Sequence, residues 1–268
     1  MPDIGLDPAA TRRQIEDKMH SMSFLAHLEE LRRRIIHSLI YITAGFGICW
    51  AFHEKIFGYM QRPIMFALKN NGLDQKLTYL NPTEPFNMYL KISLIAGLFL
   101  ACPFVLYQVW GFIAPGLYKR ERKYVLPFMI FTPALFLAGG YFGYTLVYPA
   151  ALNFLIEFSK QFTPMITINE YTDLFMVIIL GMGMIFEMPI LVFFLALFGI
   201  VSPGWMWRNL RYSILVIFII AAIVTPTTDI MNMCIFAAPM IVLYLLSILV
   251  AYLVHPSRRK KAKEKAQA

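Results

Sequence analysis

Long apolar runs separated by short polar segments dominate the sequence. A transmembrane helix needs about 20 mostly apolar residues to cross roughly 30 Å of hydrocarbon. Six runs reach or approach that length, so the pattern predicts an all-α membrane protein with six transmembrane helices. The predicted spans are 35–52, 88–113, 125–148, 174–200, 212–224 and 230–254.

The fifth run is shorter than the others. Between Arg211 and Thr225 it offers about 13 residues, which span about 20 Å at a helical rise of about 1.5 Å per residue. A helix of this length does not cross an unperturbed bilayer. We therefore expect the membrane to thin locally around it, or water to enter there.

Prolines interrupt several of the runs. They stand at Pro103, Pro127, Pro133, Pro189 and Pro239. Kinked helices favour a curved, Pro-kinked shell over a straight bundle. Two longer connections, 53–87 and 149–173, are rich in turn-forming residues and are predicted to be loops. The sequence contains no internal repeat, so an inverted-repeat transporter has no support.

Composition and charge agree with a membrane location. Hydrophobic residues make up 59% of the 268 residues and charged residues only 15%, too few to solubilise so apolar a chain. Of the 24 Lys and Arg residues, 18 fall on the side that carries both termini and six on the other. Because basic residues collect on the cytoplasmic side, both termini are predicted to be cytoplasmic. The predicted domains are a polar N-terminal segment 1–22, a membrane domain 23–254 and a basic tail 255–268.

Several function classes find no motif in this sequence. There is no nucleotide-binding glycine loop, no metal-ligand spacing and no nucleophile–base pair, so we expect neither an enzyme nor a cofactor, and no nucleic-acid partner. The three cysteines, Cys49, Cys102 and Cys234, lie in or beside apolar runs without close spacing. They are interpreted as small hydrophobic residues.

The segment just before the first span is amphipathic. Its apolar positions recur at steps of four, three and four within 24–35, which is the period of one helix face. Glu29–Arg33 and Glu30–Arg34 are spaced as helical ion pairs. The segment is either a surface helix leading into the membrane or a cytoplasmic docking surface that presents a carboxylate.

A second cytoplasmic feature runs from residue 107 to 123. Its basic residues follow the positive-inside rule, and Trp110 and Tyr118 fit an aromatic belt at the membrane interface. Glu121 follows from neither rule, because it is a lone acid among four cations. It either neutralises its neighbours or has a role of its own.

Glu187 stands near the middle of the fourth apolar run, two residues before Pro189. An ionised carboxylate in hydrocarbon costs at least a few kcal/mol, so we expect the protonated acid, which can donate and accept hydrogen bonds. In one interpretation the carboxyl satisfies a backbone group that the proline frees. In the other it faces a groove left open by the short fifth span and meets a polar group on a partner's helix.

These segments together resemble the TatC family, the multi-spanning receptor subunit of the twin-arginine protein translocase. The resemblance runs from about residue 23 to 254 and includes the six spans and the short fifth one. The segments that carry it are HLEELR from His27, YQVWGFIAPGLYKRER from Tyr107, FEMP from Phe186 and TPTTD from Thr225.

The resemblance implies a function at the bacterial cytoplasmic (inner) membrane. In this family, folded cargo proteins that carry an S/T-R-R signal peptide are recognised at the cytoplasmic face. Single-span partner subunits of the TatA/TatB type then assemble, and the proton-motive force drives transport. The expected partners are thus twin-arginine signal peptides, these single-span subunits, the lipid bilayer and further copies of the chain within the receptor complex.

The resemblance also implies site residues. The signal-binding acids of the family match Glu30 and Glu121, and the neighbouring aromatic residue matches Phe112. His27 and Arg32 match positions that frame the first acid. The chemistry is consistent, because two adjacent arginines present planar forks that carboxylates accept bidentately.

Four further positions are implied to contact partner helices. Pro63 matches a proline of the first outer loop, Glu187 the intramembrane acid, and Asp229 the acid between spans five and six. Many members carry a glutamine shortly after that last acid, and here Asn232 stands in the same region as a possible substitute donor.

Two other function classes remain open from the residues alone. A proton-coupled carrier of a small solute would use Glu187 as its relay. It predicts a closed cavity and several polar residues at mid-depth, where the spans offer only Glu187 as a strongly ionisable group. A purely structural membrane scaffold predicts that replacing Glu121 has no effect.

Overall fold

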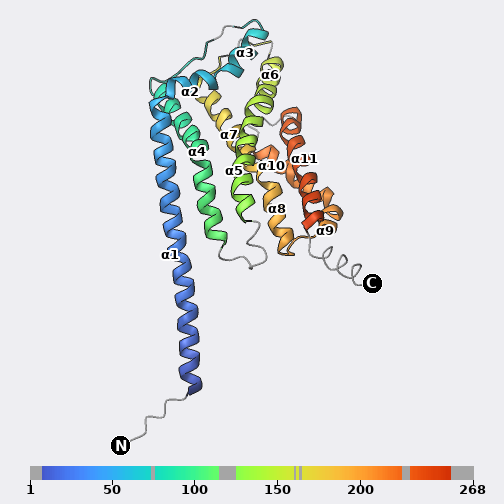
Figure 1. Cartoon of the computed structure of the whole chain (residues 1–268). Helices are drawn as coiled ribbons and strands as arrows, with labels where there is room; N and C mark the ends of the chain where they lie inside the picture. Colours follow the sequence, from blue (N-terminus) through green and yellow to red (C-terminus); the bar gives the residue numbers. More distant parts are fainter. Residues whose placement is uncertain are drawn as a thin grey trace, which may run out of the picture.

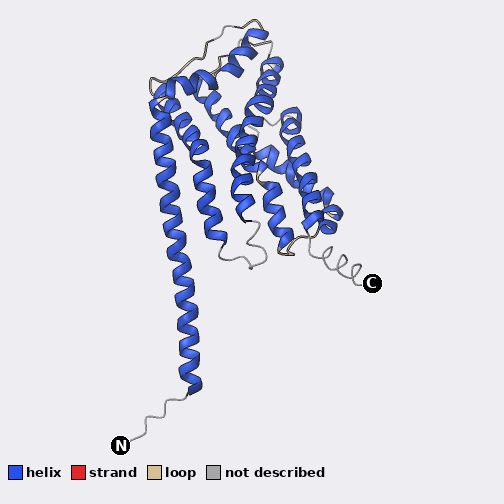
Figure 2. Ribbon diagram, in the orientation of Figure 1, coloured by secondary structure: helices blue, strands red, loops and turns tan. Residues whose placement is uncertain are grey.

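The chain is all-α, as the apolar runs predict. The computed structural model describes residues 8–73, 76–114, 125–159, 161–162, 165–224 and 230–254; the side chains of 8–24, 125, 126, 224, 232 and 254 are not described. Within these ranges the backbone is almost entirely helical (Figure 2). The helices are α1 (Pro8–Ala51), α2 (His53–Met60), α3 (Arg62–Asn70), α4 (Glu84–Ile113), α5 (Val125–Phe142), α6 (Tyr148–Phe158), α7 (Ile168–Phe186), α8 (Met188–Leu197), α9 (Pro203–Arg208), α10 (Leu210–Val224) and α11 (Ile230–Val254).

Five helical stretches of the described chain are long and apolar enough to cross a membrane. They are Leu25–Ala51, Glu84–Ile113, Pro127–Phe158, Ile168–Leu197 and Met233–Leu253, and Leu210–Ile223 is a shorter apolar helix. The short helix is the predicted fifth span. Counting it as a crossing gives the predicted six, and that count stays a prediction.

The helices form an open shell rather than a closed bundle. In Figure 1, α1 and α11 lie at opposite edges of the molecule, and the other apolar helices lie between them. α1 packs on α4, α4 on α5 and α7, and α8 and α10 on α11. The start of α1 and the end of α11 are at the same end, whereas α2 and α3 cover the other end.

The predicted loops were wrong in two places. Residues 53–70 form α2 and α3, and residues 149–158 belong to α6. α6 continues α5 through a short π-helix, Gly143–Val147. One face of α3 is buried at Ile64, Ala67 and Leu68. This packing stabilises the segment as a helix, and its turn-forming residues cluster only at its end.

Three of the five prolines lie inside helices without ending them. Pro103, Pro133 and Pro239 lie inside α4, α5 and α11. Only Pro189 accompanies a break, because α7 ends at Phe186 and α8 begins at Met188. At the N-terminus, α1 runs through residue 22 without interruption, so no backbone feature marks the predicted boundary between 1–22 and 23–254.

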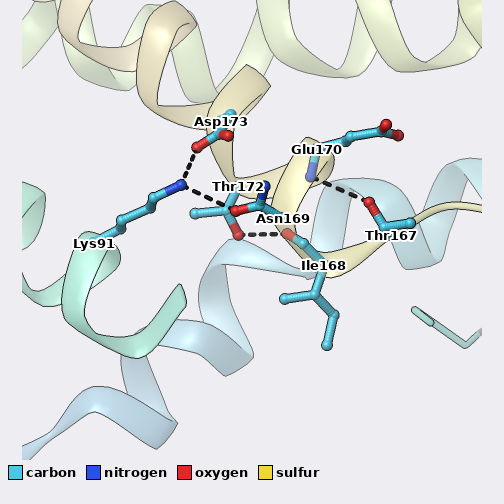
Figure 3. Close-up of polar contacts among 7 residues, drawn as sticks. All are labelled: Lys91, Thr167, Ile168, Asn169, Glu170, Thr172 and Asp173. Atoms are coloured by element: carbon cyan, nitrogen blue, oxygen red, sulfur yellow. Dashed lines mark hydrogen bonds and ion pairs between the residues drawn. The ribbon is translucent and has the colours of Figure 1, made fainter. Parts of the chain in front are cut away.

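Two hydrogen-bonded contacts join the connections opposite the chain termini. The backbone N–H of Thr78 donates to Ile166 O at 3.0 Å, and that of Ile168 donates to Thr78 O at 2.9 Å. Lys91 of α4 donates to Asp173 and Asn169 of α7 at 2.5 and 3.0 Å (Figure 3). The two segments predicted as separate loops are thus tied together and hold α4 beside α7.

The backbones of α1 and α4 approach each other closely at two glycines. A methyl group on Gly45 would lie 2.5 Å from the carbonyl oxygen of Gly97, and one on Gly97 would lie 2.5 Å from the backbone nitrogen of Phe46. Both obstacles are backbone atoms that cannot rotate away. The absence of side chains at Gly45 and Gly97 therefore sets the distance between the two helices.

Gly45→Ala should separate α1 from α4 and destabilise the protein by about 1–3 kcal/mol, the usual cost of overpacking. Gly47→Ala is the matched control, because a methyl group there meets nothing within 4 Å and alanine is the better helix former. Thermal unfolding of the purified protein in detergent measures both. Equal unfolding temperatures for the two variants would contradict the close approach.

Candidate functional site

A polar cleft lies between α1 and the end of α4. Its volume is about 660 Å³. The residues around it are Ala26, Glu29, Glu30, Arg33, Arg34, His37, Tyr41 and Gln108. All but Gln108 come from α1, whose helical period places them on one side of the helix. α4 ends beside the middle part of α1, and α1 extends beyond that end toward its own start (Figure 1).

Glu30 is the acid of this cleft with a defined partner. Its Oε1 accepts a hydrogen bond from Nη2 of Arg34 at 3.2 Å, and the two side chains are 32% and 28% exposed. This is the predicted i,i+4 pair. The companion pair is not formed, since no ion pair joins Glu29 to Arg33 in the described structure, where both are exposed.

Arg34 links the two helices. Its Nη1 donates to Oε1 of Gln108 at 2.9 Å, and Gln108 is a buried polar residue of α4. The guanidinium packs against Gly111, where any side chain would collide with it. Sequence reasoning missed Gln108 and Gly111. The sequence feature that could have indicated them is an amide side chain and a glycine one helical turn apart in an otherwise apolar run.

Beside the ion pair, His27 stacks on Phe112. Their ring centroids are 4.3 Å apart and the ring planes differ by 14°. His27 lies one helical turn before Glu30, and Phe112 lies near the end of α4. The structure thus brings together three residues that the family resemblance selected: His27, Glu30 and Phe112.

The remaining two predicted signal-binding residues are placed differently. Arg32 is exposed and does not line the main cleft, but it lines a smaller adjoining groove that shares Glu29, Arg33 and His37 with that cleft. Glu121 lies outside the described residues. The described site therefore contains one carboxylate with a fixed partner and an aromatic pair next to it.

A second, apolar groove surrounds Glu187. It measures about 340 Å³ and is lined by residues of α4, α5 and α8 together with Glu187 and Phe198, which flank α8. Oε1 of Glu187 is buried and has no hydrogen-bond partner among the described residues. The hypothesis that the carboxyl satisfies a backbone group freed by Pro189 therefore has no support at this oxygen.

Two expectations about this region were wrong. The groove of Glu187 was expected beside the short fifth span, but α10 contributes none of its lining residues. Trp110 was expected in an aromatic belt, but it is buried, and its Nε1 donates to Thr132 at 3.0 Å. In both cases the hydropathy pattern predicted how deep the residue lies in the membrane. It did not predict which side of the helix the side chain projects from.

The predicted partner-contact residues do not form one cluster in the described structure. Pro63 is half-buried near the start of α3, and Figure 1 places α3 at the opposite end from α8. Asp229 lies outside the described residues, and Asn232 lies in α11 with its side chain not described. Pro63 and Glu187 therefore do not form a single contact site in the described structure.

The apolar helices and their open arrangement define a multi-pass membrane protein, and comparisons with known proteins identify its family. A family model described as "Sec-independent protein translocase protein (TatC)" matches residues 26–239. The chain belongs to this family, TatC. Such matches lend no support to a small-solute carrier.

Relatives and solved structures agree over nearly the whole chain. The chain is 71% identical to a Sec-independent protein translocase protein TatC from Koribacter versatilis (strain Ellin345), covering 100% of this chain and 99% of the relative. A TatC from Carboxydothermus hydrogenoformans is 37% identical and covers 90% of this chain and 97% of its own length. The crystal structure of a twin-arginine translocase receptor, TatC, matches with a TM-score of 0.74 at 34% identity, covering 85% and 99% of the two chains.

Proposed function

We propose that this chain is the receptor subunit that binds the twin-arginine signal peptides of folded cargo proteins at the cytoplasmic membrane. One observation carries the proposal. In a chain of the TatC family, Glu30 lines a polar cleft between α1 and α4, beside the stacked His27 and Phe112. The cleft is open and polar, as a site for a charged peptide must be.

A signal peptide with two adjacent arginines is best bound by two carboxylates. An arginine pair offers two planar forks, and each carboxylate can accept one of them bidentately. Glu30 supplies the first acid. Glu121, nine residues after Phe112 in the segment that follows α4, supplies the second. Phe112 offers an aromatic face to the guanidinium or to the apolar part of the signal peptide.

The orientation follows from charge. The end of the molecule that carries the start of α1 and the end of α11 is proposed to face the cytoplasm, because 18 of the 24 Lys and Arg residues fall on this side. The cleft then opens toward newly made cargo. The cluster of Lys91, Asn169 and Asp173 lies at the outer end.

Membrane-impermeant cysteine probes applied from outside should label single-cysteine variants in 54–86 and 149–172, but not in 114–123 or after residue 256. Exposed positions such as Lys69 and Pro82 are suitable outer sites. The readout is mass-tagged protein from intact cells, with permeabilised cells as the control. Labelling of 114–123 from outside would reverse the orientation and remove the site from the cytoplasm.

Glu121→Ala should weaken binding of a twin-arginine peptide strongly. Truncating one partner of a substantially buried charge pair costs about 2–5 kcal/mol, and a wet interface reduces that figure. Glu29→Ala is the matched control, because Glu29 precedes the bonded acid and has no ion pair to Arg33. Isothermal titration with Arg-Arg and Lys-Lys peptides measures the effect. Unchanged binding to Glu121→Ala, with Lys-Lys bound as well as Arg-Arg, contradicts the site.

The groove of Glu187 is proposed to take a transmembrane helix of a TatA/TatB-type partner. Its lining is almost entirely apolar, as a lipid-embedded helix requires, and the buried Oε1 of Glu187 has a free hydrogen-bonding position. Pro63, Asp229 and Asn232 would add contacts elsewhere along the partner or on further copies of this chain. The transport step, driven by the proton-motive force, would follow this assembly.

Glu187→Gln should retain most transport, since it keeps the shape and hydrogen bonding of the side chain. Glu187→Leu should leave signal binding intact and impair partner assembly, because it removes the carboxyl group whose Oε1 has no hydrogen-bond partner among the described residues. Site-specific crosslinking to the partner reports assembly, and Met184→Leu, on the exposed side of α7, is the control. Loss of signal binding in Glu187→Leu with normal partner crosslinks would assign Glu187 to cargo reception or folding.

A further inference from the structure

In the proposed function, the carboxylate of Glu30 binds an arginine of the signal peptide. In the structure without a peptide, that carboxylate is already paired with the guanidinium of Arg34. Nη2 of Arg34 lies 3.2 Å from Oε1 of Glu30. We propose that Arg34 is a resident competitor: it pairs with Glu30 in the empty receptor, and an arginine of the signal peptide exchanges with it. The inference rests on the proposed function and adds a residue that sets the affinity of the same site.

The contact between Arg34 and Glu30 is weak enough to be exchanged. At 3.2 Å it is longer than the usual 2.7–2.9 Å of charge-assisted hydrogen bonds. Both side chains are about one-third exposed, so water and salt screen the pair. Exposed ion pairs change an equilibrium constant by up to about fivefold, equivalent to about 1 kcal/mol. An incoming guanidinium that binds bidentately exceeds that value.

Arg34 keeps a partner after the exchange. Its other terminal nitrogen, Nη1, donates to Gln108 at 2.9 Å, and Gln108 is buried on α4. The glycine at position 111 leaves room for the guanidinium against the same helix. Because Gln108 and Gly111 hold Arg34 independently of Glu30, the exchange breaks one weak contact and leaves the partly exposed guanidinium hydrogen-bonded to Gln108.

The Arg34–Glu30 pair lowers the affinity of the site for any cationic peptide. A peptide that offers only a weakly bonding cation gains little at Glu30, because Arg34 already neutralises the carboxylate. A peptide must instead bind Glu30 better than Arg34 does. Replacing Arg34 should therefore strengthen binding, whereas a residue that only supports the fold or orients Glu30 would weaken binding when replaced.

The test measures the dissociation constant of a fluorescent peptide containing Ser-Arg-Arg, with the full-length chain in lipid nanodiscs. Arg34→Gln should tighten binding by about three- to fivefold relative to Arg33→Gln, on the scale of an exposed ion pair. Arg33→Gln is the matched control, since it removes the same charge from the same cleft without an ion pair to Glu30. It corrects for the general effect of charge on a cationic peptide.

Comparing Arg34→Gln with Arg33→Gln in a Glu30→Gln background tests whether the effect depends on the contact between Arg34 and Glu30. There, Arg34→Gln and Arg33→Gln should bind the peptide equally, because no carboxylate remains to compete for. Weaker binding in Arg34→Gln, or an equal advantage in both backgrounds, overturns the inference. Normal binding by Glu30→Gln alone would instead overturn the proposed function.

Arg34→Lys provides a second variant for the case in which Arg34→Gln does not fold. A lysine keeps a cation at this position, but its single nitrogen cannot bond Glu30 and Gln108 as a planar fork does. Binding should tighten in the same direction and by a smaller factor. Weaker binding by a folded Arg34→Lys protein, as shown by thermal unfolding, also contradicts competition.

Discussion

The close approach of α1 and α4 is the constraint on which the proposed receptor site depends. Gly45 and Gly97 let the two backbones meet, and this crossing fixes the separation of the helices over the turns that follow. Toward the end where α4 stops, the same separation places Arg34 on Gln108 and His27 on Phe112. A site made of side chains from two helices requires such a crossing, since neither helix alone carries the complete set.

The main core and the polar cleft lie in different parts of the molecule. The main core of buried side chains includes Tyr148, Tyr171 and Ile64, and a backbone bridge at Thr78 ties together the connections at the end opposite the chain termini. The polar cleft lies away from that core, on a helix whose side chains are mostly exposed. A packed core and an accessible cleft suit a receptor that must bind and release a peptide without unfolding.

The carboxylates of Glu30 and Glu187 lie in two different environments. Glu30 is partly exposed and paired with a cation, so it suits recognition of a charged ligand by exchange. Glu187 lines an apolar groove with a buried, unpartnered oxygen, so it suits a single hydrogen bond to another helix within the membrane. The environment, rather than the residue type, separates the two proposed roles.

The sequence by itself determined the all-α class, the apolar stretches and the short fifth one, because hydropathy along the chain reports directly on solvation by lipid. It also predicted the Glu30–Arg34 pair, which depends only on helical spacing. The burial of Trp110, the position of the Glu187 groove and the roles of Gln108 and Gly111 were decided by the tertiary structure. These features depend on which way each helix faces, and in a chain apolar on nearly all sides the hydrophobic pattern carries little information about that direction.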